Sequence, residues 1–148
     1  MQETCVTVLK YTSPIATNKS YMAFIPAVLV AAGIAILSLM EQTHAPRVVV
    51  NDKLMHGFMY AVLGISLILP LLRTSNPLNS KPLTRYIGTF VGVTMYGVLM
   101  EALQRFCTLT RSGEMADLYA DSLGSLLALL LVAVLRWLWH KKKMTNDQ

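Results

Sequence analysis

The sequence predicts an all-α polytopic membrane protein, a bundle of four transmembrane helices. Of its 148 residues, 54% are hydrophobic and only 14% are charged, whereas about 25% of the residues of a typical soluble domain are charged. The apolar residues gather in four blocks. Each block approaches the roughly 20 residues that a helix needs to cross a bilayer core of about 30 Å. This composition excludes a disordered chain, and two cysteines are too few for a disulfide-stapled secreted domain.

The first block, 21–40, contains no charged residue. Lys10 and Lys19 precede it, as basic residues precede the core of a signal peptide. However, the block is longer than a normal signal-peptide core, and no clear small-residue cleavage site follows it. We therefore expect an uncleaved first helix over 21–40, preceded by a tail, 1–20.

The second and third blocks predict helices over 55–72 and 86–103. The second is uncharged unless His56 is protonated, and the third is apolar apart from Glu101 near its end. Short loops that contain proline or glycine separate the blocks, which is typical of antiparallel neighbouring helices.

The fourth predicted helix, 118–139, has a shorter strictly uncharged stretch. It spans a bilayer if Arg136 extends to the interface while Trp137 and Trp139 lie in the interfacial aromatic belt. A basic tail, 140–148, follows, and we interpret its lysines as headgroup anchors rather than as a nucleic-acid patch.

The basic residues predict the orientation. With four spans, both termini and the loop between the second and third helices share one side, and nine of the 13 Lys and Arg residues lie there. The positive-inside rule therefore places both tails in the cytoplasm. On this interpretation the net charge of +5 reflects the orientation of the chain in the membrane. No nucleic-acid partner is therefore expected.

The acidic residues gather at the opposite, outer end, where six of the eight lie. Helical rise places His56, Glu101 and Asp121 at nearly the same depth, at the outer boundary or about one turn inside it. Three helices thus bring an ionisable group to one level.

Helical spacing groups the polar residues into stripes. Asp52, His56 and Tyr60 recur at every fourth residue of the second helix. The stripes of the third and fourth helices combine polar side chains with small ones, which allow helices to approach closely: Gly97, Glu101, Gln104 and Arg105, and Asp117, Asp121, Gly124, Ser125 and Ala128. Because a charge that faces lipid is costly, we expect these stripes to face one another around a polar pocket open to the outside.

The candidate binding residues of this pocket are Asp52, Lys53, His56, Tyr60, Glu101, Gln104, Arg111, Asp117 and Asp121. One interpretation is a structural network, in which Arg105 or Arg111 pairs with a carboxylate and His56 hydrogen-bonds another. The other is a functional site, because ionisable groups inside a membrane often mark one. In an enzyme, His56 would be the base, with Glu101 or Asp117 as acid or orienting group. We expect no metal and no cofactor, since no HExxH motif or paired histidine occurs.

Three segments carry a resemblance. Residues 52–60 fit the pattern D-K-x-x-H-x-x-x-Y, residues 96–104 fit Y/F-G-x-x-x-E-x-x-Q, and residues 111–124 fit R-x5-D-x3-N-x2-G except that Asp121 replaces the usual Asn. In this order, over about 50–135, they resemble the VanZ-like family. Asp121 in place of Asn changes the hydrogen bonds that this position can form, because an ionised carboxylate can accept hydrogen bonds but cannot donate them.

The resemblance implies a VanZ-like four-helix domain over 21–139 in the bacterial cell (inner) membrane, in a family associated with teicoplanin resistance. An outward-facing pocket suits an envelope role: binding an envelope lipid, a lipid-linked precursor or a membrane protein partner. The alternatives are a membrane-embedded hydrolase or transferase acting on a lipid, and a small transporter. The transporter is disfavoured because the cytoplasmic halves of the predicted helices contain no ionisable residues.

Overall fold

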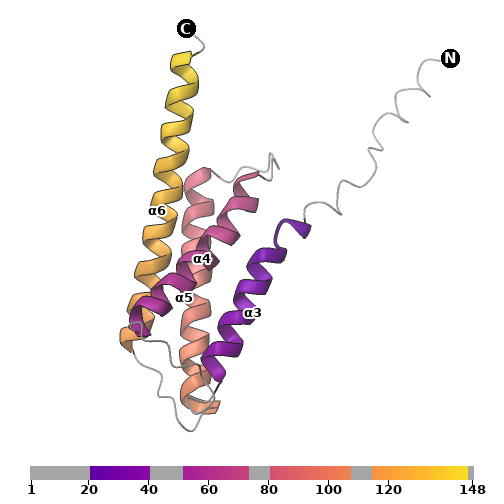
Figure 1. The fold of residues 1–148 in the computed structure, drawn as a ribbon, viewed down its shortest axis with the longest axis vertical. Helices are drawn as coiled ribbons and strands as arrows, with labels where there is room; N and C mark the ends of the chain where they lie inside the picture. The colour runs from indigo at the N-terminus through magenta and orange to yellow at the C-terminus, as the bar shows by residue number, and fades with distance from the viewer. Residues whose placement is uncertain (1–20, 41–51, 74–80, 108–114, 147–148) are drawn as a thin grey trace, which may run out of the picture.

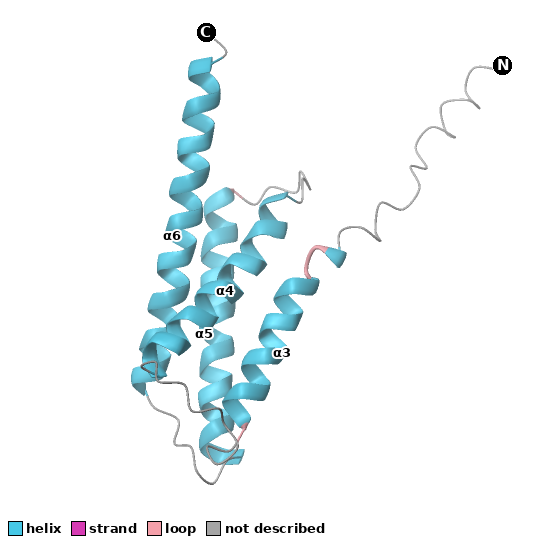
Figure 2. Ribbon diagram, in the orientation of Figure 1, coloured by secondary structure: helices cyan, strands magenta, loops and turns pink. Residues whose placement is uncertain are grey.

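The computed structural model describes residues 21–40, 52–73, 81–107 and 115–146, and these ranges are all-α. They contain α3 (Ile25–Leu39), α4 (Asp52–Arg73), α5 (Pro82–Cys107) and α6 (Met115–Asn146). The helices run alternately up and down, so the starts of α4 and α6 lie at the same end as the last turns of α3 and α5 (Figures 1 and 2). The predicted all-α class is confirmed.

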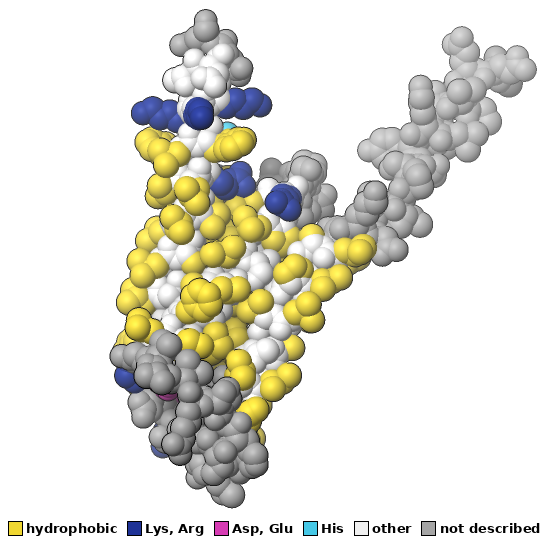
Figure 3. Space-filling view, viewed as in Figure 1, with side chains coloured by type: hydrophobic (Ala, Val, Ile, Leu, Met, Phe, Trp, Pro, Cys, Tyr) yellow, Lys and Arg dark blue, Asp and Glu magenta, His cyan; other side chains and the backbone are white. Residues whose placement is uncertain are grey.

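Three helices, α4, α5 and α6, are long and apolar enough to cross a membrane, with 22, 26 and 32 residues. Their outward faces carry large exposed apolar side chains, such as Phe58 on α4 and Leu127 on α6. Hydrophobic side chains cover much of the visible face of the bundle, and Lys and Arg lie mainly near its upper end (Figure 3). Because so much exposed apolar surface is unfavourable in water, these features indicate a helical membrane protein.

The first helix is shorter than the predicted 21–40. Its 15 residues give a length of about 22 Å, less than a bilayer core of about 30 Å. Pro26 lies in the first turn of α3, where a missing N–H costs nothing, and Met40 is already extended. The structure thus shows α3 as a short apolar helix beside three candidate spans.

The other helices extend beyond the predicted 55–72, 86–103 and 118–139 at both ends. Polar residues continue a helix where their charge suits its dipole. Asp52 lies in the first turn of α4, and Arg105 lies in the last turn of α5. Hydropathy therefore locates the apolar middle of each helix better than its ends.

The α4 and α6 helices pack most extensively, and they cross where Gly57 meets Gly124. A Cβ atom placed on Gly124 would lie 2.0 Å from the carbonyl oxygen of Gly57. The predicted small-residue face of α6 continues this contact, since Ser125 and Ala128 are buried. Gly64 of α4 lies against Ser125. Small residues thus let these two backbones touch, as the close-packing rule for membrane helices requires.

Two side chains of α5 hold α3 against the bundle. The Tyr96 hydroxyl donates to the carbonyl oxygen of Ala31 at 2.6 Å. Nearer the polar end, Nε2 of Gln104 donates to the carbonyl oxygen of Ser38 at 3.1 Å. The second bond supplies a donor to a carbonyl in the last turn of α3.

Candidate functional site

Polar side chains from α4, α5 and α6 meet at one end of the bundle. His56 of α4 is 5% exposed, and Asp117 and Asp121 of α6 are 7% and 0% exposed. Glu101 of α5 is partly buried. Buried charged groups are rare unless they are paired, so this end of an otherwise apolar bundle is the strongest candidate for a functional site in the described chain.

The central contact is a buried pair across the α4–α6 interface. The Nδ1–H of His56 donates to Oδ1 of Asp121 at 3.1 Å. The pair lies one residue before the Gly57 contact on α4 and three before Gly124 on α6. The close crossing of the two backbones thus brings an imidazole and a carboxylate within hydrogen-bond distance.

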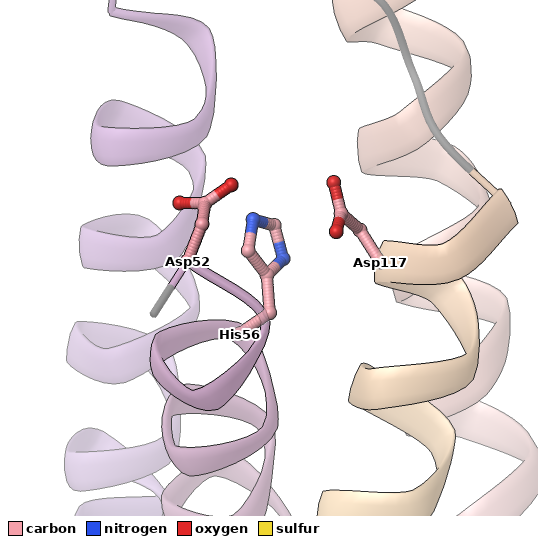
Figure 4. Close-up of side chains that lie close together, drawn as sticks. All are labelled: Asp52, His56 and Asp117. Atoms are coloured by element: carbon pink, nitrogen blue, oxygen red, sulfur yellow. The ribbon is translucent and has the colours of Figure 1, made fainter. Parts of the chain in front are cut away.

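A second ion pair forms the edge of the site. The Nζ atom of Lys53 lies 3.2 Å from Oδ1 of Asp117, and the Lys53 side chain is 49% exposed. Asp52 is exposed on the same turn of α4. The His56 ring lies between Asp52 and Asp117 (Figure 4). The edge of the site therefore presents carboxylates and one ammonium group.

The α5 helix closes the inner side of the site. A Cβ atom on Gly97 would lie 3.3 Å from Oδ2 of Asp121 and 3.3 Å from the Tyr60 ring. Tyr60 is 1% exposed, and its ring centroid lies 6.2 Å from that of Tyr96 in a tilted arrangement. The absence of a side chain at Gly97 therefore gives the Asp121 carboxylate room against α5.

Two overlapping triads share His56. In the inner triad, His56, Glu101 and Asp121 each offer one ligand-type atom, and these atoms lie within 4.8 Å of one another. In the outer triad, Asp52, His56 and Asp117 do the same. Nitrogen and carboxylate oxygen are donor atoms that divalent cations accept, so both triads are chemically able to hold one.

The structure brings together most of the predicted site residues, with several differences. Gln104 is buried but bonds to α3, and Arg105 is exposed. Arg111 lies outside the described residues. The cation beside Asp117 in the described chain is Lys53, not a predicted arginine.

Two features were not predicted. The glycine contact at Gly57 was missed, although the small residues recurring on α6 were a signal for it. The expected pocket is also more enclosed than open, since His56, Asp117 and Asp121 are buried. Among the candidate binding residues that the structure describes, only Asp52 and Lys53 are exposed.

The opposite end of α4 borders a groove between α3 and α4 of about 430 Å³. Its walls are mainly apolar, with Val30 and Ile65 among them and Arg73 at its end. The Nη1 group of Arg85 donates to the carbonyl oxygen of Leu71 at 2.7 Å at this end. The groove contains none of the predicted site residues.

Comparisons with known proteins found no counterpart: no protein-family model, no curated protein and no solved structure matches the chain. The resemblance to the VanZ-like family therefore rests on the three motifs. The arrangement of the described residues identifies a helical membrane protein with a buried His–carboxylate site.

Proposed function

We propose that this chain is a VanZ-like protein of the bacterial cell membrane that binds the polar headgroup of an envelope lipid at the polar end of its bundle. The observation that supports this most strongly is the site's exposed edge, where Asp52 and Lys53 border a buried cluster. Lipid tails would lie along the apolar faces of α4 and α6 while the headgroup contacts this edge.

The charge distribution supports an outward orientation of the site. Arg73, Arg85 and the lysines of α6, Lys141–Lys143, lie at the end opposite His56 and Asp121 (Figure 1). By the positive-inside rule this basic end faces the cytoplasm, so both termini are cytoplasmic and the site faces the outer leaflet. In this arrangement α3 is the fourth membrane-embedded helix.

The chemistry of the edge favours a zwitterionic headgroup. Asp52 and Asp117 are carboxylates suited to an ammonium group, and Lys53, which pairs with Asp117, is suited to a phosphate. Phosphatidylethanolamine carries both groups. Phosphatidylglycerol offers only the phosphate, which the carboxylates would repel.

Purified protein is expected to retain phosphatidylethanolamine more strongly than phosphatidylglycerol when native mass spectrometry compares the two. Lys53→Gln should lower retention at least threefold, because the phosphate loses its ammonium partner. The matched control is Lys141→Gln, which removes a lysine at the opposite end and should leave this preference unchanged. Equal losses in both variants, or equal retention of the two lipids, would rule out the proposal.

The VanZ-like resemblance extends the proposal to glycopeptide susceptibility. Expression of the chain in a teicoplanin-sensitive bacterium supplies the cellular arm of the same experiment. If the proposed site is responsible, the Lys53→Gln variant should no longer change teicoplanin susceptibility, although its abundance in the membrane is unchanged. The Lys141→Gln variant should change susceptibility as the wild type does.

A second function, hydrolysis or group transfer on a lipid, is favoured by the His56–Asp121 hydrogen bond. A carboxylate that accepts from one ring nitrogen orients the imidazole and leaves the other nitrogen to act as a base. Asp121 holds the position for this role, which the sequence had suggested for Glu101 or Asp117. Conversion of a labelled membrane-lipid extract by the purified chain, and its loss in His56→Gln, would distinguish this enzyme from a binding protein.

A further inference from the structure

The inner triad is a feature that headgroup binding at the exposed edge does not use. His56 is 5% exposed and Asp121 is 0% exposed, and each comes from a different helix. Glu101 adds a carboxylate from the third. Two carboxylates at such a site repel each other strongly unless a positive charge or a proton separates them, because the low dielectric of the interior strengthens the repulsion.

One oxygen of the triad needs a partner. Oδ2 of Asp121 is buried and receives no hydrogen bond from the described residues. It lies on the side that faces α5, where the missing side chain of Gly97 leaves it room. A buried acceptor without a donor costs about 1–3 kcal/mol, and more when it is charged. This oxygen is therefore an independent feature of the site that a bound cation would satisfy.

We propose that His56, Glu101 and Asp121 bind one divalent transition-metal ion, such as Zn²⁺ or Mn²⁺. One imidazole nitrogen and two carboxylate oxygens are three protein ligands, the number that catalytic zinc sites combine with a water molecule. The imidazole favours a transition metal over Mg²⁺ or Ca²⁺. This site is new relative to the sequence prediction, which expected no metal.

The distances suit one ion. Ligands at about 2.0–2.1 Å from a tetrahedral ion lie roughly 3.3 Å apart. Nδ1 of His56 and Oδ1 of Asp121 are already 3.1 Å apart. A carboxylate oxygen of Glu101 lies within 4.8 Å of a ring nitrogen of His56 and of a carboxylate oxygen of Asp121. The ion takes the place of the Nδ1 proton: an imidazolium releases that proton to solvent, whereas a neutral ring carries it on Nε2 instead.

The outer triad is the weaker alternative. Its Asp117 already pairs with the ammonium group of Lys53, which would repel a cation. Its Asp52 is exposed, so water competes for that carboxylate. The two triads share His56, and only substitutions of their other members separate them.

The test uses the full chain in detergent without added lipid, so it is independent of the proposed headgroup binding. Equilibrium dialysis with Zn²⁺ alone, and electron paramagnetic resonance with Mn²⁺ alone, are expected to give one saturable ion per chain. Glu101→Gln and Asp121→Asn should each weaken binding at least tenfold. Asp52→Asn, the matched control from the outer triad, should change it less than threefold.

Binding of less than one ion per wild-type chain would overturn the proposal, and this result does not depend on whether the variants fold. An equal or greater loss of affinity in Asp52→Asn and Asp117→Asn would also overturn it, because the ion would then occupy the outer triad. Proton release that accompanies binding in the wild type and disappears in His56→Gln would support His56 as a ligand.

Discussion

Gly124→Ala is expected to destabilise the protein by at least about 3 kcal/mol, because the helices must separate to admit a methyl group. The new Cβ atom would lie 2.0 Å from the Gly57 carbonyl oxygen and 2.6 Å from its carbon. Both atoms belong to the backbone, so no side chain can rotate away. The loss would be measured as the free energy of unfolding in detergent, together with the amount of monodisperse protein recovered.

Gly92 and Gly97, two glycines of α5, provide controls for the effect of Gly124→Ala on stability. A Cβ atom on Gly92 meets nothing within 4 Å in the described chain, so Gly92→Ala should be neutral or stabilise the helix by up to about 1 kcal/mol. Gly97→Ala should have an intermediate effect, since its Cβ atom would lie 3.3 Å from Asp121 and Tyr60. Similar stability of the Gly92 and Gly124 variants would show that α4 and α6 do not cross at these glycines.

His56→Leu is expected to cost about 3–5 kcal/mol of folding free energy, measured with a metal chelator present. The substitution leaves the buried carboxylate of Asp121 without its hydrogen-bond donor, and an uncompensated buried charge has a cost of this size. Asp121→Leu should cost less, because a neutral imidazole is easier to bury than a carboxylate.

A double-mutant cycle isolates the pair. The variant with leucine at both positions should lose less free energy of unfolding than the two single variants lose together. The difference should be about 1–3 kcal/mol. Lys53 and Asp117 form the comparison pair, and their coupling should stay below about 1 kcal/mol because the lysine side chain is 49% exposed. Additive effects at 56 and 121 would contradict the pairing.

Much of the fold is predictable because the bilayer limits what an apolar segment can do. The blocks 55–72, 86–103 and 118–139 each lie within one observed helix. The prediction for 21–40 is less accurate, since hydropathy does not register that Pro26 favours the first turn of a helix or that Met40 leaves it. Composition measures how apolar a segment is, whereas the helix ends depend on backbone hydrogen bonds.

The sequence predicts which face of each helix carries the polar residues of the site, but not which of these side chains pair with one another. The spacing of Asp52, His56 and Tyr60 places them on one stripe, and the structure buries the latter two. Which carboxylate meets His56 depends on the rotation and depth of α6 relative to α4, set where Gly57 meets Gly124. That relation between two helices is not encoded in the periodicity of either one alone.

Solid-state nuclear magnetic resonance in lipid bilayers can measure whether His56 and Asp121 meet inside the bundle. In a chain whose other histidines, His44 and His140, are replaced by Gln, ¹⁵N-labelled His56 should show strong dipolar coupling to an Asp ¹³Cγ within about 4 Å. The coupling should vanish in Asp121→Asn and persist in Asp52→Asn. Coupling that survives in Asp121→Asn, or is absent throughout, would show that His56 and Asp121 do not form this pair.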